Sequence, residues 1–136
     1  MLSAYDISTG ALVAQRTRIN TIAGNIANVS TTHNEAGQRA PYQPRFVVFE
    51  SQEGVQGTHG AAGVKVQSIE IEDTQPRLKY QPDHPDADEN GYVAYPNIDL
   101  TTEMVDAMEA TRAYEANVGV IQITNDLGQQ TLRILA

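Results

Sequence analysis

Acidic and amide side chains gather at residues 86–91, which read Asp-Ala-Asp-Glu-Asn-Gly. Oxygens at the first, third and fifth positions and a glycine at the sixth match the first half of an EF-hand calcium loop. The twelfth position of such a loop supplies a bidentate glutamate, but here it is Asn97. Pro82, Pro85 and Pro96 disfavour the flanking helices. The pattern therefore favours a solvated turn, with weak calcium binding as the alternative hypothesis.

The other residues with ligand or catalytic chemistry are scattered. His33, His59 and His84 fall in three separate predicted loops, and their spacing supports no zinc ligand set unless the fold brings them together. The chain has no cysteine and therefore no thiolate ligand, disulfide or thiol nucleophile. It has no glycine-rich phosphate loop and no G-x-S-x-G elbow. We therefore predict no metal, no cofactor and no enzymatic activity.

Length and charge narrow the classes of partner. With 136 residues, 40% of them hydrophobic, the chain is long enough for one domain with a core. A net charge of −8 disfavours nucleic acid and anionic membranes as partners. The N-terminus carries Asp6 where a secretion signal carries a basic residue, and no apolar run is long enough to span a bilayer. These rules alone predict a soluble, cytoplasmic protein.

The first predicted element is a helix over residues 3–29. Ser3 and Asp6 fit a capping box, with Ser3 as the N-cap. Gly10 and Gly24 each cost a helix interior roughly 1 kcal/mol, so this helix needs tertiary partners. Apolar residues follow a heptad seam that is imperfect in its early turns: Leu12, Ile19, Ile22, Ile26 and Val29.

The last predicted element is a helix over residues 99–135. Pro96 precedes it, and Asp99 can cap its first turn. Apolar and small residues follow a 3-4 spacing that is interrupted at Asn125 and Gly128: Met104, Ala107, Thr111, Tyr114, Val118, Ile121, Leu132 and Leu135.

Between the helices, all six prolines and short alternating segments indicate β structure on loops. The predicted strands cover residues 45–50, 63–72, 78–80 and 92–95, with a slip near Ser68 that indicates a bulge. The predicted fold class is α+β: two long terminal helices pair as an antiparallel coiled coil around a small antiparallel β insert. The predicted units are residues 1–30, 31–98 and 99–136.

Long stretches of the two helices carry few charges. After Asp6 the first has only Arg16 and Arg18, and most of its other polar positions are neutral. From Ala113 onward the last helix has only three charged residues: Glu115, Asp126 and Arg133. Neutral amides and hydroxyls cost less to desolvate than ions, so such faces suit helices contacted on several sides by other helices. A loosely packed, partly disordered tail is the alternative.

Two motifs at opposite ends of the chain resemble the signatures of flagellar rod and hook proteins. Residues 24–28, Gly-Asn-Ile-Ala-Asn, close the first helix, and residues 103–117, from Glu103 to Asn117, open the last. Residues 41–49 and 84–97 resemble the proximal rod members of this family. Two features depart from the family pattern. The usual Thr-Pro-Gly-Tyr turn is replaced by Thr-Thr-His-Asn at residues 31–34, and the basic residues after the Pro-Tyr pair are reduced to Arg45.

The resemblance implies a structural subunit whose terminal helices pack into the inner tube of a helical rod that transmits motor torque. It implies export by the flagellar type III apparatus without a cleaved signal, a final place in the periplasmic rod, and partners that are copies of itself and other rod proteins. A soluble calcium-binding or adaptor module with a coiled-coil stalk is the alternative. The residues expected at the assembly interface are Leu12, Ile19, Ile22, Asn25, Ile26, Asn28, Met104, Ala107, Tyr114, Asn117, Val118, Ile121, Leu132 and Leu135. The three asparagines are expected to make hydrogen bonds at helix ends or between subunits.

Overall fold

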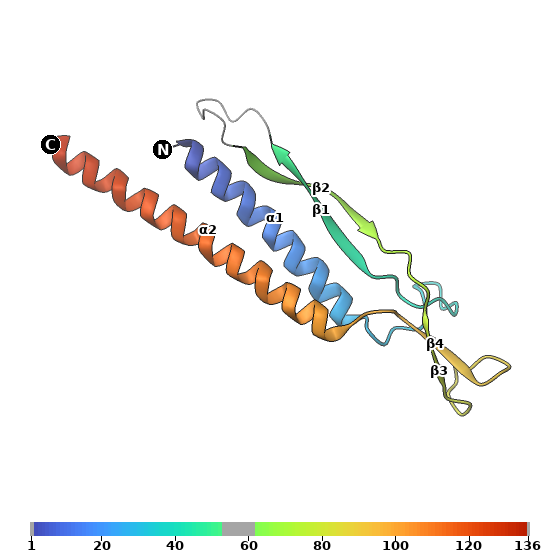
Figure 1. The fold of residues 1–136 in the computed structure, drawn as a ribbon. Helices are drawn as coiled ribbons and strands as arrows, with labels where there is room; N and C mark the ends of the chain where they lie inside the picture. Colours follow the sequence, from blue (N-terminus) through green and yellow to red (C-terminus); the bar gives the residue numbers. More distant parts are fainter. Residues whose placement is uncertain (1, 53–61, 136) are drawn as a thin grey trace.

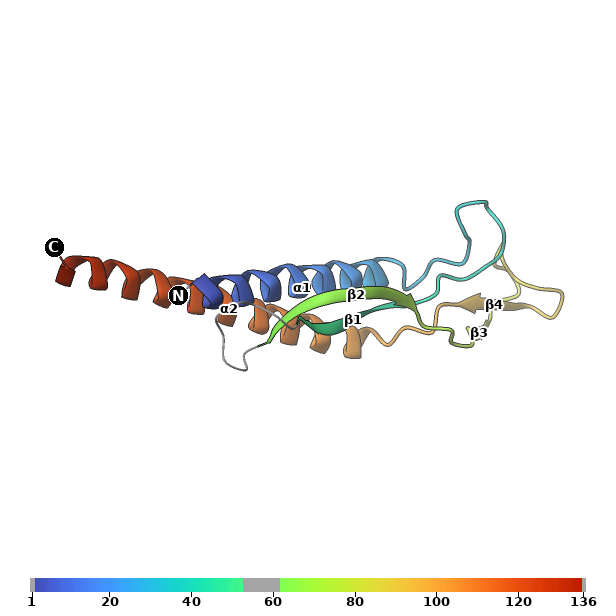
Figure 2. The same ribbon diagram turned by 90° about the horizontal axis from the view of Figure 1, so that it is seen from above.

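Two helices and two separate β ribbons form an elongated molecule (Figures 1 and 2). The computed structural model describes residues 2–52 and 62–135. The elements are α1 (Leu2–Ala27), β1 (Arg45–Gln52), β2 (Gly63–Ile71), β3 (Arg77–Tyr80), β4 (Tyr92–Tyr95) and α2 (Leu100–Leu135). Figure 1 shows the β3–β4 ribbon beyond one end of the helix pair, and the chain termini toward the other end. The predicted α+β fold class is confirmed.

The helices run antiparallel, and polar contacts fix their register. Near the start of α1, the Tyr5 hydroxyl donates to Asn125 of α2. Further along, an Arg18 guanidinium nitrogen lies 3.3 Å from a Glu109 carboxylate oxygen. Because Tyr5 already lies opposite Asn125, α2 runs on past α1, and its last turns have no α1 residue beside them (Figure 1).

The predicted cap of α2 is confirmed, whereas the predicted cap of α1 is wrong. The Asp99 carboxylate accepts a hydrogen bond from the Thr101 backbone N–H at 2.9 Å, which satisfies a donor that the helix leaves free. The first helix already includes Leu2, so Ser3 lies inside the helix and cannot be its N-cap. The spacing of a capping box does not by itself fix where a helix begins.

The first ribbon pairs β1 with β2 in an antiparallel ladder. Its register shifts between Val48 and Phe49, which face Ser68 and Val66, so Gln67 is the extra residue of a bulge. The bulge predicted near Ser68 is therefore confirmed. The second ribbon pairs β3 with β4, which contain the two shorter predicted strands.

Helix α1 contacts α2 on one side and both strands of the β1–β2 ribbon on another (Figures 1 and 2). Gly10 makes the approach of the ribbon possible, because a Cβ there would lie 3.0 Å from the Val64 backbone oxygen. Gly24 has no such role: a Cβ there would meet the Tyr42 hydroxyl at 3.9 Å, an ordinary van der Waals distance.

The two glycines therefore give opposite predictions. Gly24→Ala is expected to raise the free energy of unfolding by roughly 0.5–1 kcal/mol, because alanine restricts the unfolded chain and favours the helix. Gly10→Ala gains the same helix propensity but pushes against β2, so it should stabilise the chain less than Gly24→Ala does. Urea unfolding followed by circular dichroism compares the two variants. Equal gains would show that the ribbon does not press on α1 at Gly10.

The most deeply buried side chains on the face that α2 turns to α1 are small or polar. Helix α1 is the element that α2 packs against, so the buried positions of α2 mark this face. Ala110 and Thr124 are buried there, and the other positions of the stripe are half-buried: Ala113, Asn117, Ile121 and Gly128. Small side chains let the two helices approach closely. Tyr114, Val118 and Ile121 are also half-buried, but most of the larger apolar side chains of α2 face outward, among them Met104, Val105, Met108, Ile123 and Leu127.

Candidate assembly site

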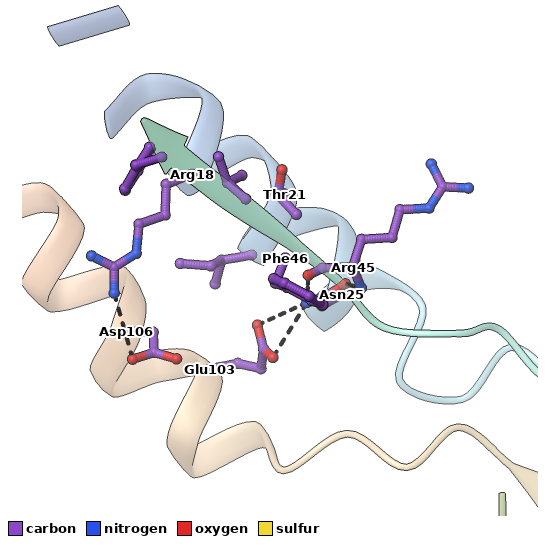
Figure 3. A pocket seen from close by; sticks show the side chains of 10 residues that line it. Arg18, Thr21, Asn25, Arg45, Phe46, Glu103 and Asp106 are labelled. Carbon is purple, nitrogen blue, oxygen red and sulfur yellow. Dashed lines mark hydrogen bonds and ion pairs between the residues drawn. The ribbon is translucent and has the colours of Figure 1, made fainter. Parts of the chain in front are cut away.

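Asn25 joins α1, β1 and α2 at one point (Figure 3). Its side chain is only 2% exposed. Its amide nitrogen donates to the Arg45 backbone oxygen at 2.8 Å, and its amide oxygen accepts from the Arg45 backbone N–H at 2.9 Å. The nitrogen also donates to Glu103 at 3.2 Å, and the oxygen accepts from the Tyr42 hydroxyl at 3.3 Å. Every hydrogen-bonding site of the amide is thus used.

Partial burial raises the pKa of the Glu103 carboxyl above its ordinary value of 4.5. The hydrogen bond from Asn25 acts in the opposite direction, while the negative charges of Asp106 and Glu72 add to the rise. A carboxyl whose pKa is raised in the folded chain binds its proton more tightly there than in the unfolded chain. Its ionisation therefore weakens the fold.

This pKa shift predicts a pH dependence. As the pH rises from about 4.5 through the folded pKa of Glu103, the folded chain holds more protons than the unfolded chain, so stability falls across that window. Glu103→Gln should therefore unfold like the unaltered chain below pH 4.5 and become the more stable of the two above the window. Urea unfolding across this pH range tests the prediction, with Glu115→Gln, exposed on the same helix, as the control for loss of one charge. A stability difference independent of pH would contradict it.

An open groove of about 360 Å³ lies beside Asn25 (Figure 3). Its lining comes from three elements: Arg18, Thr21, Ile22 and Asn25 of α1; Arg45, Phe46, Val47 and Phe49 of β1; and Glu103 and Asp106 of α2. In Figure 3 the Arg45 side chain points away from Glu103, and its guanidinium lies 5.9 Å from the centre of the Tyr42 ring. The α2 wall of the groove carries the two carboxylates of Glu103 and Asp106, and Arg18 of α1 lies 3.8 Å from Asp106 (Figure 3).

The acidic segment 86–91 forms a turn in the structure. One Asp88 carboxylate oxygen accepts the backbone N–H groups of Asn90 and Tyr92, each at 2.8 Å. Gly91 has a φ of 83°, in the left-handed region that favours glycine. In the described parts of the chain, no three histidine or acidic side chains are placed to hold a metal ion. The hydrogen bonds of Asp88 form the turn that the sequence pattern favours, and calcium binding stays a hypothesis.

Asp88→Ala is expected to lower the free energy of unfolding by about 1 kcal/mol, because two backbone donors lose their carboxylate acceptor at a solvated site. Thermal unfolding of this variant measures the effect, and Glu89→Ala, exposed beside it, is the matched control. Millimolar calcium should leave the midpoint of the unaltered chain unchanged. A midpoint that rises with calcium, and fails to rise in Asp88→Ala, would restore the calcium hypothesis.

Two of the three histidines meet at one carboxylate. His33 Nε2 lies 3.1 Å from one oxygen of Asp86, and His84 Nδ1 lies 3.7 Å from the other. The Thr32 hydroxyl donates to Asp86 at 2.8 Å, which ties the loop after α1 to the β3–β4 turn. His59 lies outside the described residues, so a three-histidine site stays untested.

The residues predicted for the assembly interface divide into two groups. Ile22 and Asn25 are buried within the chain, and nine others are half-buried: Leu12, Ile19, Ile26, Asn28, Ala107, Tyr114, Asn117, Val118 and Ile121. Met104, Leu132 and Leu135 are exposed in the single chain. Their contact with other chains stays a prediction.

The side chains of the other two predicted asparagines bond within their own helices. Asn28 donates to the backbone oxygen of Gly24, and Asn117 donates to that of Ala113, each one helical turn earlier.

The sequence interpretation missed several of the most deeply buried residues of the two helices. Ser8, Ala14, Ala110 and Thr124 are buried, yet none was assigned to the interface. Side-chain size misled the prediction, because most of the residues it selected on the helices were large and apolar. A signal was available in the small residues of the last helix at 3-4 spacing.

Comparisons with known proteins agree with this architecture. Residues 6–33 match the family model described as flagella basal body rod protein, and residues 89–134 match the one described as flagellar basal body rod FlgEFG protein C-terminal. Both ends of the chain thus carry the features of a flagellar rod protein. No helix in the described part of the chain is long and apolar enough to cross a membrane.

Curated relatives narrow the family. The chain is 39% identical to the flagellar basal-body rod protein FlgC of Salmonella typhimurium, over 98% of this chain and 97% of the relative. It is 42% identical to FlgC of Yersinia enterocolitica, with the same coverage. It is 37% identical to FlgC of Bacillus subtilis, over 96% of this chain and 95% of the relative. The chain therefore belongs to the FlgC family of flagellar basal-body rod proteins, which gives it a structural role in the rod of the basal body.

Proposed function

We propose that this chain is a structural, non-enzymatic subunit of the proximal rod, which assembles through its terminal helices into a helical tube that transmits motor torque. The observation that carries the proposal is the distribution of side chains on α2. The buried residues of α2 are the small Ala110 and the polar Thr124, whereas most of its large apolar residues are exposed. A helix pair that is complete in water has the opposite arrangement. The outer face of α2 therefore suits contact with neighbouring subunits.

The end of α2 supports the same proposal. Beyond Asn125 the helix continues past α1, and its large apolar residues are exposed, with Ile134 at 85%. The chain's accessible surface is 9520 Å², whereas a compact monomer of this size exposes about 7,000 Å². The difference is comparable to the area that a large permanent interface buries. The subunit thus has the surface that an assembly would cover.

The proposal includes the route and the final place of the protein. By its resemblance to rod proteins, the subunit would pass through the flagellar type III apparatus with its N-terminus uncleaved and reach the periplasmic section of the rod. Its partners would be copies of itself and other rod proteins. The absence of cysteine suits export as an unfolded chain, because no disulfide can form prematurely.

Mass spectrometry of detergent-resistant basal bodies, purified from the source bacterium, tests the proposal. We expect the chain in this fraction with an intact N-terminal peptide. Its presence only in the soluble fraction of flagellated cells would contradict both the rod assignment and the export route. A cleaved N-terminus in basal bodies would contradict the export route alone.

A further inference from the structure

The edge of β1 that faces away from β2, here called its outer edge, already makes the hydrogen bonds of a paired strand at one residue. The Asn25 amide bonds both the N–H and the C=O of Arg45, which is the pairing that a neighbouring strand would make. These two backbone groups therefore point away from β2. In a regular strand, residues two apart present their backbone groups to the same edge. The backbone groups of Val47 are thus directed to the same outer edge as those of Arg45.

This edge of β1 borders the groove of about 360 Å³, and no other element of the described chain pairs with it. Phe46, Val47 and Phe49 give the groove an apolar wall. Opposite them, Glu103 and Asp106 give it an acidic wall, next to Glu109 one turn along α2. Arg18 offsets one of these three negative charges, because its guanidinium lies 3.8 Å from Asp106 and 3.3 Å from Glu109. A fitting occupant would be an extended segment with both apolar and basic side chains.

Strand β3 of the same sequence has these properties. It reads Arg-Leu-Lys-Tyr, and all four residues are exposed. Leu78 is 66% exposed and Tyr80 64%, although both are large apolar side chains on a strand. Strand β3 pairs only with β4 in the described residues, so its other edge is free. An exposed apolar edge strand is a template for pairing with another chain.

We propose that β3 of a second copy adds to the free edge of β1 as a further strand, with Arg77 and Lys79 facing the acidic wall formed by α2. The inference rests on the proposed function, because it names one contact between rod subunits. The two surfaces are different parts of the chain, so the contact is heterologous. Such contacts repeat without closing and generate helical assemblies, as a rod requires.

Thiol cross-linking tests this contact, since the chain has no cysteine of its own. Val47→Cys and Leu78→Cys are introduced together, and purified basal bodies are treated with a short bis-maleimide. We expect a ladder of covalent oligomers, and single-cysteine chains should link only when mixed with each other. Leu78→Cys with Ala94→Cys, which face each other across β3 and β4, checks that the reagent works. Val47→Cys with Glu35→Cys, exposed elsewhere, is the matched negative control.

The charge pairing has its own test. In the Val47→Cys, Leu78→Cys chain, Lys79→Glu should reduce the cross-linked yield roughly tenfold by placing like charges together, whereas Lys79→Arg should preserve it. An equal yield from both variants would remove the acidic wall from the proposal.

Failure of this contact can be told apart from failure of the rod assignment. If the chain is present in basal bodies and the β3–β4 control links, but Val47→Cys with Leu78→Cys does not, the strand addition is wrong and the rod function stands. If the chain is absent from basal bodies, the rod function is wrong. In that case the bis-maleimide reaction is repeated on the concentrated, purified Val47→Cys, Leu78→Cys chain. A ladder of oligomers would support the contact between β1 and β3, and unlinked monomer would contradict it.

Discussion

Asn25→Ala is expected to lower the free energy of unfolding by roughly 2–4 kcal/mol, a large change for a residue that is not part of an apolar core. The side chain is 2% exposed, and its amide bonds α1 to β1 through Arg45 and to α2 through Glu103. Alanine removes all of these hydrogen bonds and leaves a space beside the backbone of β1. Polar groups that lose a partner in a buried site cost about 1–3 kcal/mol each, reduced where water enters.

Urea unfolding followed by circular dichroism measures the effect of Asn25→Ala. The matched control is Asn20→Ala, in the same helix but exposed, which should change stability by no more than about 0.5 kcal/mol. Similar losses for the two variants would show that the Asn25 hydrogen bonds do not hold the three elements together.

Asn25→Asp separates the chemistry of this site from its volume. Aspartate keeps the size and one acceptor oxygen, but it replaces the donor toward Arg45 and Glu103 with a second negative oxygen. We expect a loss of stability at neutral pH that becomes smaller in acid, because a protonated carboxyl regains a donor. A loss that does not change with pH would point to packing alone.

Ile22→Asp is expected to abolish both the stable fold and assembly into basal bodies. Ile22 is 7% exposed and lies one turn before Asn25 on the same wall of the groove. A buried carboxylate without a partner typically costs about 3–5 kcal/mol, a large part of the stability of a chain this size. Loss of motility, and loss of the protein from purified basal bodies, are the measurable outcomes.

Two variants control for Ile22→Asp. Ala23→Asp introduces the same charge at the next residue, which is exposed, and should keep the purified chain folded. Ile22→Val removes one methylene group and should cost about 0.5–1.5 kcal/mol while preserving motility. A fully motile strain with Ile22→Asp would refute the packing role of this residue.

The secondary structure was predictable because local physics decides it. The Asp99 cap and the 3-4 spacing of the last helix predicted an element that ends, as expected, at Leu135. Short apolar segments predicted the four strands, and the slip in the alternation of residues 63–72 predicted the bulge beside Ser68. The predicted cap of the first helix was wrong, because short capping patterns also occur inside a first helical turn.

The sequence motifs also pointed to the family, and the comparisons established it. The motifs predicted less about the candidate site, because a motif gives residue types and their spacing but not the residues that they contact. Asn25 was expected at a helix end or a subunit contact. Its partners Arg45 and Glu103 lie 20 and 78 residues away in the sequence.

Only the tertiary structure decided which residues meet. It selected small residues such as Ala110 for the helix interface and left Met104 outside, because close approach of two helices rewards small side chains over large ones. It also brought His33 and Asp86 together from separate loops. Hydrogen-bond ladders and helical periods act over a few residues, so sequence alone determines them. The choice of partners across the chain depends on packing of the whole molecule, which no local pattern encodes.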